Sequence, residues 1–370
     1  MINSVSPDLN TIKDAEPLAR LQLQKRMTEQ TMPLSFAGET DPPTRQDRVR
    51  RALFRGESLR LLHLHYRHLV WALATLLLED EWNPHDLTNI ALAPAKKVEM
   101  AIIAHERGVV AGVAETAWLF GQFGLDAESK KTDGDMFGAG DTLLRIQGNA
   151  RTIFSLERLG LDLLQRMCGI ATATREIQNT FDQHSANTLV IATHKKACSL
   201  LDKRAVECGA GGTHRLGLGD AILIETNHLQ LWGDREQETI PWTLRRAWAF
   251  REQAAFIEIE VTSQDSALAA ARTFQSLQRA DKVHFPCLVL LNNMHPAEVT
   301  NAVAALKAAG VWHDVLLEAG GEVVDTQIDA YADCGVDAVS VGRLTHSPRA
   351  LDLRLKLDPL LGDGNEPNQL

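Results

Sequence analysis

The second half of the chain alternates between short apolar runs and longer amphipathic segments, and this alternation limits the possible folds most. Six apolar runs have the length and composition of buried strands: Thr188–Ala192, Ala221–Ile224, Ile257–Val261, Cys287–Leu291, Val315–Glu318 and Ala338–Val341. Between most of them lie segments with helical spacing: Thr239–Ala255, Gln264–Leu277, Ala297–Ala309 and Val324–Cys334. Repeated strand–helix units predict a parallel sheet, and six in a row predict a closed or nearly closed α/β barrel.

Polar and glycine residues follow these strands. In such barrels the ligand lies at the C-terminal ends of the strands. The residues found at these positions are Lys195, Glu225, Glu260, Asn292, Asn293, Glu318 and Gly342. The sequence therefore predicts a polar ligand site at this end of the barrel.

One stretch, from Thr193 to His228, combines basic side chains with a glycine-rich turn. Its cationic residues are Lys195, Lys196, Lys203, Arg204, His214 and Arg215. Cations beside flexible backbone suit a polyanionic ligand, and they stand out in an acidic chain. The alternative is a solvated basic helix followed by a flexible loop.

The first half of the chain is typical of a smaller α+β unit. Helical spacing over Leu59–Glu79 predicts an amphipathic helix, and Lys97–His105 with Val109–Val113 predicts a hairpin around Arg107-Gly108. Thr142–Gly148 is expected to be a strand of an antiparallel sheet. Ala150–Thr180 is expected to be a long helix, in which Gly169 permits close packing or a bend.

The two ends of the chain look different from its middle. Residues 1–56 are polar, with a short helix expected near Leu18–Thr28, and Arg45–Arg55 is expected to be a solvated arm rather than a segment docked on an acidic surface. The predicted domains are an extension (1–56), an N-terminal α/β sandwich (57–165), an α/β barrel (166–350) and a C-terminal segment (351–370) that returns to the sandwich and has a frayed tail.

Composition excludes several classes of protein. The 370 residues carry a net charge of −10, which argues against nucleic acid as the main partner. No apolar run approaches the length of a membrane span, and the N-terminus does not have the pattern of a secretory signal. Five dispersed cysteines indicate reduced thiols, and hence a cytoplasmic protein without a cysteine metal site or a disulfide framework.

Several motifs, in the same order, resemble those of quinolinate phosphoribosyltransferases, also called carboxylating nicotinate-nucleotide pyrophosphorylases. The resemblance covers about residues 70–357. Its motifs are H-D-L-T (85–88), G-V-V-A-G-V (108–113), E-R-L-G-L-D-L-L-Q-R-M-C-G-I-A-T (157–172), C-G-A-G-G-T-H-R-L-G-L-G-D-A-I-L-I (208–224), I-E-I-E-V (257–261), L-L-N-N-M-H-P-A-E-V (290–299) and C-G-V-D-A-V-S-V-G-R-L-T-H-S-P-R-A-L-D-L-R-L-K-L (334–357).

This resemblance implies a fold and a reaction. The fold is an N-terminal α/β sandwich with a C-terminal open α/β barrel, in a homodimer whose sites are completed by the partner subunit. The reaction joins quinolinate to phosphoribosyl pyrophosphate and yields nicotinate mononucleotide, pyrophosphate and carbon dioxide, with magnesium as cofactor. Such substrates need arginine and lysine to neutralise carboxylates and phosphates, and carboxylates to hold the metal ion.

The resemblance also implies roles for particular residues in substrate binding. Arg158 would reach the neighbouring subunit's site, with a helix-surface salt bridge as the alternative. His214 and Arg215 match a substrate-binding pair, with a locally hydrogen-bonded turn as the alternative. Lys195 matches the lysine of the family's T-R-K motif and is expected to be catalytic.

A second group of implied residues would hold the metal ion and the phosphates. Glu260 would be a catalytic acid on the metal ion or the ribose, with a structural carboxylate as the alternative. Gly320, Gly321 and Gly342 fall on phosphate-binding turns, unless these are ordinary tight turns. His346 lies in the last motif and is expected at the substrate site.

Four positions depart from the family pattern. The T-R-K-T motif contains His194 in place of its arginine, and L-I-K-D-N-H contains Glu225 in place of its lysine. L-D-N-M contains Asn292 in place of its aspartate, and the E-A-S-G-G turn ends on Glu322. Of these changes, only Asn292 makes the site less negative at neutral pH, and Lys196 is a candidate to replace part of the lost charge.

Three hypotheses therefore follow. The first is a working phosphoribosyltransferase that takes quinolinate or a related aromatic acid. The second is a divergent member with a changed acceptor or no catalysis, which acts as a metabolite-binding or accessory protein. The third, an enzyme of unrelated chemistry that shares only the barrel, conflicts with the H-R-L-G-L block.

Overall fold

The computed structural model describes residues 44–81, 86–184, 187–193, 197–233, 235–323 and 327–357. By its contacts the chain divides into two units, residues 1–42 and 43–370, and all described residues belong to the second. The helix expected near Leu18–Thr28 lies outside the described residues.

A four-stranded antiparallel sheet with the strand order β12-β1-β5-β3 is the centre of the sandwich domain. The strands are β1 (Lys97–Ala104), β3 (Asp126–Glu128), β5 (Thr142–Asn149) and β12 (Leu353–Leu357). Because β12 is the last described element and pairs with β1, the C-terminal segment completes the sheet of the first domain. The predicted antiparallel sheet is confirmed.

Four helices accompany this sheet: α4 (Leu64–Glu81), α5 (Leu87–Leu92), α6 (Val113–Gln122) and α7 (Ala150–His184). The helices predicted over Leu59–Glu79 and Ala150–Thr180 are confirmed, with shifted ends. Gly169 lies within the continuous helix α7, and a Cβ atom there would collide with the backbone of Arg349. The glycine therefore permits close packing of α7 against the returning C-terminal segment.

The predicted hairpin around Arg107-Gly108 is wrong. The residues after the turn form the short strand β2 (Gly108–Val109), which pairs with β4 (Met136–Phe137), whereas β1 pairs with β5 and β12. Val113 then begins helix α6. Gly112, with φ 89°, precedes this helix, and its backbone conformation ends the extended segment.

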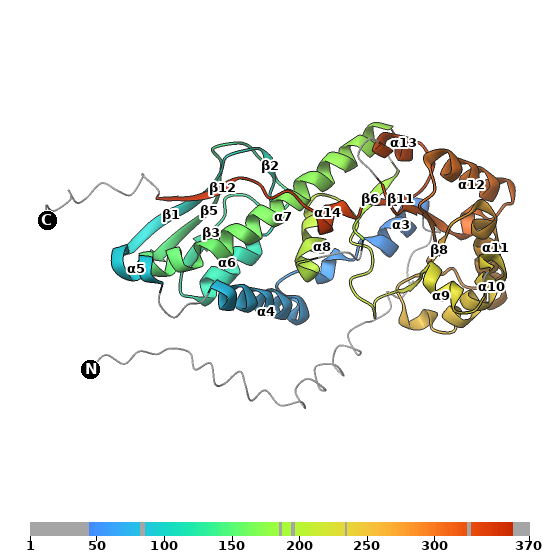
Figure 1. Cartoon of the computed structure of the whole chain (residues 1–370), viewed down its shortest axis with the longest axis horizontal. Helices are drawn as coiled ribbons and strands as arrows, with labels where there is room; N and C mark the ends of the chain where they lie inside the picture. Colours follow the sequence, from blue (N-terminus) through green and yellow to red (C-terminus); the bar gives the residue numbers. More distant parts are fainter. Residues whose placement is uncertain are drawn as a thin grey trace, which may run out of the picture. The chain divides into compact units, whose positions relative to one another are not determined.

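The barrel domain contains a six-stranded parallel sheet with the order β6-β11-β10-β9-β8-β7 (Figure 1). The strands are β6 (Leu189–Ile191), β7 (Ile222–Ile224), β8 (Ile257–Val261), β9 (Cys287–Asn292), β10 (Leu316–Gly320) and β11 (Ala338–Ser340). All six predicted strands are confirmed. β6 and β7 are edge strands, so the sheet is the predicted open barrel.

The helices of this domain connect successive strands of the sheet, except for the last helix, which follows the last of these strands. They are α8 (Ser199–Cys208), α9 (Thr226–Gln230), α10 (Glu236–Trp248), α11 (Gln264–Asp281), α12 (Pro296–Ala308), α13 (Ile328–Ala332) and α14 (Arg343–His346). Except for α8, whose buried side chains belong to the core of the sandwich domain, their apolar faces and the outward-facing side chains of the strands form one large hydrophobic core.

The N-terminal side of the barrel is covered by helix α3 (Arg45–Leu53). Val49, Ala52 and Leu53 are buried against side chains from the strands, including Ile191 and Leu288. The expectation that Arg45–Arg55 is a solvated arm is therefore wrong. Apolar residues every three to four positions were the missed signal, because the abundant arginines obscured a buried helical face.

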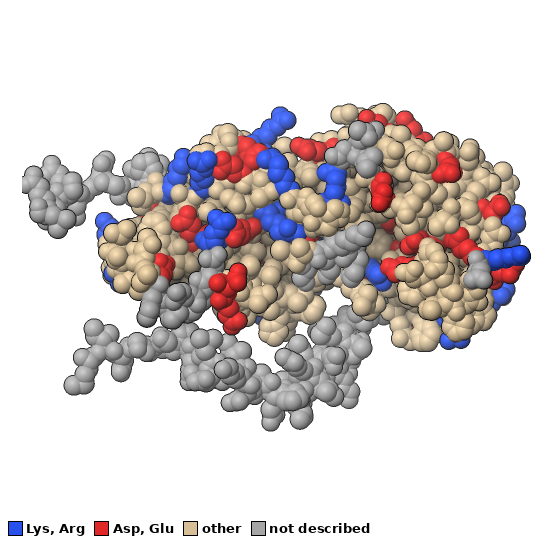
Figure 2. Space-filling view, in the orientation of Figure 1, with Lys and Arg blue, Asp and Glu red and all other residues tan. Residues whose placement is uncertain are grey.

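Basic side chains are prominent over the sandwich domain on the face seen in Figure 2, where several acidic side chains lie over the barrel domain. Within the described ranges, no helix is both long and apolar enough to cross a membrane.

Candidate active site

The glycine-rich turn after α8 runs beside the edge strand β6. Gly212 forms a parallel bridge with Ile191, and its N–H donates to the carbonyl of Val190 at 2.8 Å. A Cβ atom on Gly212 would lie 2.7 Å from Cγ2 of Ile191, closer than such atoms pack. Glycine is therefore required here by the close approach of the two backbones. The turn leads directly into the predicted pair His214-Arg215.

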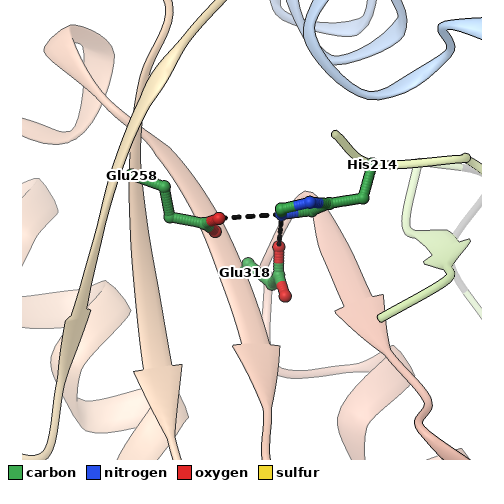
Figure 3. A group of neighbouring side chains, drawn as sticks. All are labelled: His214, Glu258 and Glu318. Carbon is green, nitrogen blue, oxygen red and sulfur yellow. Dashed lines mark hydrogen bonds and ion pairs between the residues drawn. The ribbon is translucent and has the colours of Figure 1, made fainter. Parts of the chain in front are cut away.

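His214 is buried in the barrel interior and contacts two buried carboxylates (Figure 3). Its Nε2 lies 2.7 Å from Oε2 of Glu258 on β8 and 3.5 Å from Oε2 of Glu318 on β10. The three side chains offer ligand atoms within 4.8 Å of one another, which a metal ion also requires. The 2.7 Å separation is that of a charge-assisted hydrogen bond, so an ion pair accounts for the arrangement without a metal ion.

The carboxylates control the charge of His214. Burial by itself favours neutral imidazole, but Glu258 and Glu318 outweigh it and raise the pKa of His214 from 6.5 to about 9. Burial and the nearby Glu318 raise the pKa of Glu258 to about 7. Burial is the largest single influence on Glu318 and acts to raise its pKa, but His214, together with hydrogen bonds to Glu258 and Ser340, outweighs it, so the pKa of Glu318 is lowered. His214 is therefore a cation at neutral pH.

Two nitrogen atoms of the His214-Arg215 pair remain available to a ligand. Among the described residues, Nδ1 of His214 and Nε of Arg215 are buried and have no hydrogen-bond partner. An unsatisfied buried donor costs about 1–3 kcal/mol. Two such donors on cationic side chains are what a site for an anionic molecule requires. Substrate binding by this pair remains a prediction, for which these two donors are the structural basis.

Lys203 holds the backbone of the pair. Its Nζ is buried and donates to the carbonyls of Thr213 and Arg215, at 2.6 and 2.7 Å. Between these carbonyls His214 has a φ of 53°, in the left-handed region that residues with a Cβ atom seldom adopt. The ammonium group therefore stabilises an unfavourable backbone conformation, which aims His214 at the carboxylates.

Arg204, one residue further along α8, has a different set of partners. It pairs with Asp133 at 3.0 Å and Glu207 at 2.7 Å, and lies 3.7 Å from Glu115. This buried network joins α8 to the sandwich domain. The expectation that Lys203 and Arg204 belong to a ligand-facing basic cluster is therefore wrong, and so is the alternative of a solvated basic helix. Both side chains are buried and bind the protein itself.

At the C-terminal end of β8, Glu260 accepts two hydrogen bonds on one oxygen. Thr226 Oγ1 donates to Oε1 of Glu260 at 2.7 Å, and Nδ2 of Asn292 donates to the same atom at 2.6 Å. Glu260 and Asn292 are thus brought together, as their places at the ends of neighbouring strands predict. Thr226 was not predicted to be at the site.

Glycines line the turns at the ends of β10 and β11. A Cβ atom on Gly320 would overlap Oγ of Ser340, and Gly321 has a φ of 103° and lies against Asn292 and Asn293. A Cβ atom on Gly342 would lie 3.3 Å from Cδ2 of His346. The four predicted residues Gly320, Gly321, Gly342 and Asn292 thus lie on adjacent turns. Their contact with phosphate remains a prediction.

Two of the departures from the family pattern have clear positions. Glu225 is the half-buried residue that precedes α9, and its N–H donates to Nδ1 of His228 at 2.9 Å. Glu322 is exposed, and its N–H donates to Oδ1 of Asn293 at 3.0 Å. His194 and Lys195, together with Lys196, lie outside the described residues.

Arg158 lies on the exposed surface of a helix. Its side chain is 65% exposed on α7 and pairs with Asp162 at 3.1 Å. Within one subunit this is the helix-surface salt bridge that we considered as the alternative.

The structure adds Glu258 and corrects the depth of Glu318. Period-two alternation in I-E-I-E-V places Glu258 on the same face as Glu260, which was the available signal. Glu318 was expected at the end of a strand, but β10 continues to Gly320. Glu318 therefore lies two residues deeper, where it contacts His214.

Comparisons with known proteins agree with this fold. Residues 86–168 match the N-terminal domain, and residues 170–356 the C-terminal domain, of quinolinate phosphoribosyl transferase. The chain therefore belongs to the quinolinate phosphoribosyl transferase family, as its motifs predicted.

The relatives cover most of the chain. A probable nicotinate-nucleotide pyrophosphorylase [carboxylating] of Methanothermobacter thermautotrophicus is 33% identical over 74% of this chain and 93% of its own length. A protein of the same name from Archaeoglobus fulgidus is 31% identical over 73% and 98%. The solved nicotinate-nucleotide pyrophosphorylase of Francisella tularensis superposes with a TM-score of 0.67 at 26% identity, covering 79% of this chain and 96% of its own.

Proposed function

We propose that this protein is a phosphoribosyltransferase of pyridine nucleotide biosynthesis. It joins quinolinate, or a related aromatic acid, to phosphoribosyl pyrophosphate and yields nicotinate mononucleotide, pyrophosphate and carbon dioxide. The observation that carries the proposal is the pair His214-Arg215, with two buried cationic donors lacking partners beside a carboxylate-held imidazole. The names of the relatives give the same reaction class.

The buried residues His214 and Arg215 bind and orient the acceptor acid. Quinolinate carries two carboxylates, and His214 and Arg215 neutralise negative charge in a buried site, where the attraction is stronger than in water. Glu258 keeps Nε2 of His214 engaged, so Nδ1–H remains directed at the ligand. The pyridine nitrogen of quinolinate forms a bond to the ribose carbon that carries the pyrophosphate. The bond between that carbon and the pyrophosphate oxygen breaks, and pyrophosphate leaves with its electrons.

The outer turns bind the phosphates. Gly320, Gly321 and Gly342 lie on turns whose backbone N–H groups suit anions, and the φ of 103° at Gly321 is one that residues with a Cβ atom seldom adopt. His346 lies next to Gly342 and supplies a further polar side chain. Lys195 is proposed to act on the donor, on the resemblance of its motif alone.

The residues at the C-terminal ends of β8 and β9 could bind magnesium through one carboxylate, that of Glu260. Oε1 of Glu260 already accepts two hydrogen bonds, and Asn292 offers an amide where the family has a second carboxylate. Magnesium in nucleotide sites is commonly held by one or two carboxylates with substrate phosphates. Glu260 would therefore hold an ion that neutralises the pyrophosphate charge.

We further propose a homodimer with shared sites in the cytoplasm. Arg158 is exposed, and its ion pair with Asp162 lies on the helix surface, so its side chain can reach a second subunit's acceptor. All five cysteines are free thiols, in keeping with a reducing compartment. Mixing Arg158→Ala chains with His214→Ala chains should restore activity in one hybrid site. No recovery in verified heterodimers would contradict shared sites.

A second candidate is a divergent member with a changed acceptor or without catalysis. The neutral donors Thr226 and Asn292 on Glu260, and the carboxylate of Glu225, favour it. A single-turnover assay with carboxyl-labelled quinolinate and phosphoribosyl pyrophosphate separates the two. Labelled carbon dioxide with equimolar nicotinate mononucleotide supports the first candidate, and quinolinate binding without product supports the second.

A further inference from the structure

Helix α3 ends directly against the loop that carries His214, although it lies outside the residues that match the family domains. The carbonyl of Leu53 accepts from the N–H of His214 at 3.0 Å and from Oγ1 of Thr213 at 3.2 Å. The N–H of Arg55 in turn donates to Oγ1 of Thr213 at 2.9 Å. The start of the loop is therefore attached to the end of α3.

Arg55 attaches the other end of the same loop. Its Nε donates to both oxygens of Asp220, at 2.9 and 2.8 Å, and the pair is mostly buried. Oδ2 of Asp220 also accepts from the N–H of Leu216 at 2.9 Å. Because Asp220 closes the turn that follows Arg215, the guanidinium fixes the segment 216–220 against the same helix end.

Helix α3 is a firm base for these contacts. At its beginning Arg45 forms a bidentate pair with Asp337, at 2.6 Å for both bonds, and stacks on Trp312 at 3.7 Å. Its apolar face is buried against the barrel strands. Because α3 is itself held in place, movement of the loop would break its hydrogen bonds to Leu53 and Arg55.

We infer that Arg55 is a positioning residue for the acceptor-acid site. Arg55 holds segment 216–220 in place, so the loop is attached to α3 on both sides of His214. His214 therefore keeps its left-handed backbone conformation and the orientation of its side chain. The inference rests on the proposed function for the identity of the acceptor. It predicts a selective effect: binding of the acid depends on Arg55, whereas binding of phosphoribosyl pyrophosphate at the turns that carry Gly320, Gly321 and Gly342, with which Arg55 has no hydrogen bond among the described residues, does not.

The test compares Arg55→Ala with the matched control Arg48→Ala. Arg48 belongs to the same helix and donates to the carbonyl of His313, away from the loop. In ligand-free Arg55→Ala, amide hydrogen exchange at His214 and Leu216 should accelerate more than about tenfold. By calorimetry, quinolinate should bind about fivefold more weakly and phosphoribosyl pyrophosphate equally well. Arg48→Ala should leave all three quantities unchanged.

Further variants of the Arg55–Asp220 ion pair separate a positioning role from a general structural one. Arg55→Lys keeps a cation opposite Asp220 and should recover most of the affinity, which a merely structural role would not require. Unchanged exchange and affinity in Arg55→Ala would overturn the inference, as would equal weakening of both ligands. If Arg55→Ala does not fold, Asp220→Asn removes the same ion pair from the other side. If wild-type protein binds no quinolinate, the proposed function fails, and the exchange measurement still decides the inference.

Discussion

Two layers of the barrel interior, two residues apart along the strands, are stabilised in different ways. The inner layer consists of His214, Glu258 and Glu318, which are buried and interact as charges. The rim layer consists of Glu225, Thr226, Glu260, Asn292 and Glu322, which are half-buried or exposed and bind through neutral donors. Three of the four departures from the family pattern fall in the rim and none in the inner layer.

This difference indicates which residues of such a site tolerate substitution. A buried charge that loses its partner costs about 3–5 kcal/mol, so inner-layer residues are constrained as a group. Rim residues touch solvent and can exchange a carboxylate for an amide at small cost to the fold. The family pattern therefore persists in the buried inner layer, while the solvent-facing rim has diverged from it.

Removal of the inner-layer support should have the largest effect. Lys203→Met leaves the carbonyls of Thr213 and Arg215 without their shared donor, at a cost of about 2–4 kcal/mol in the free energy of unfolding. Denaturant titration measures this loss, and quinolinate binding should fall with it. The control is Lys130→Met, since that side chain is 64% exposed. Equal stability of the two variants would show that the ammonium does not hold the turn.

Truncation of the acceptor-binding pair should mainly affect binding. His214→Ala and Arg215→Ala should each weaken calorimetric binding of quinolinate more than tenfold, because truncation of a buried charge partner costs about 2–5 kcal/mol. Phosphoribosyl pyrophosphate should bind nearly as well as to wild type. If quinolinate affinity stays the same in both variants, these residues do not form its site.

The inner layer should also make stability depend on pH. The pKa of His214 in the folded protein, about 9, exceeds its usual 6.5, so its contribution is complete below pH 6.5 and is lost as the pH rises through 9. The raised pKa of Glu258, about 7, acts in the same direction at lower pH. The free energy of unfolding should fall by on the order of 2–3 kcal/mol between pH 6.5 and 9.

The matched control for this pH dependence is His214→Gln, which lacks the titrating group. Its free energy of unfolding should change less than that of wild type over the same interval, in denaturant titrations at fixed ionic strength. Parallel pH curves for the two proteins would mean that His214 does not titrate in this range.

The smallest effect is expected at the rim. Glu225→Lys reverses the charge beside the acceptor and should raise quinolinate affinity, since two carboxylates about 4 Å apart repel by roughly 4 kcal/mol at an effective dielectric near 20. Stability should fall by less than about 1 kcal/mol, because a carboxylate at a helix N-terminus is lost. His194→Arg should add to the gain. Weaker binding by Glu225→Lys would show that Glu225 does not face the acceptor.

The sequence predicted the barrel well because strand and helix periodicity are local. All six strands were found in this way, whereas the pair His214-Arg215 was singled out by the basic stretch around it and by its match to the family motif. Helix α3 was missed because its role depends on burial against strands that are distant in sequence. The charge density of Lys203 and Arg204 suggested ligand contacts, whereas their partners, backbone carbonyls and carboxylates of other elements, are visible only in three dimensions.

The rim shows the same limit of local reasoning. The places of Glu260 and Asn292 at neighbouring strand ends predicted that they meet, and they do. The participation of Thr226 depends on the short turn into α9, which no periodicity indicates. Alternation placed Glu258 and Glu260 on one face. Only the three-dimensional structure shows that Glu258 contacts His214, whereas Glu260, nearer the strand end, contacts Thr226 and Asn292.

The protonation state of His214 tests the account most directly. Nitrogen-15 NMR of the ligand-free protein, with His214 assigned by comparison with His214→Gln, follows its imidazole through a pH titration. The account predicts an imidazolium through neutral pH, titrating near 9, because Glu258 and Glu318 hold the charge. A His214 imidazole that is neutral at pH 7, with titration at or below 6.5, would contradict the claim that the inner layer holds a cation for an anionic acceptor.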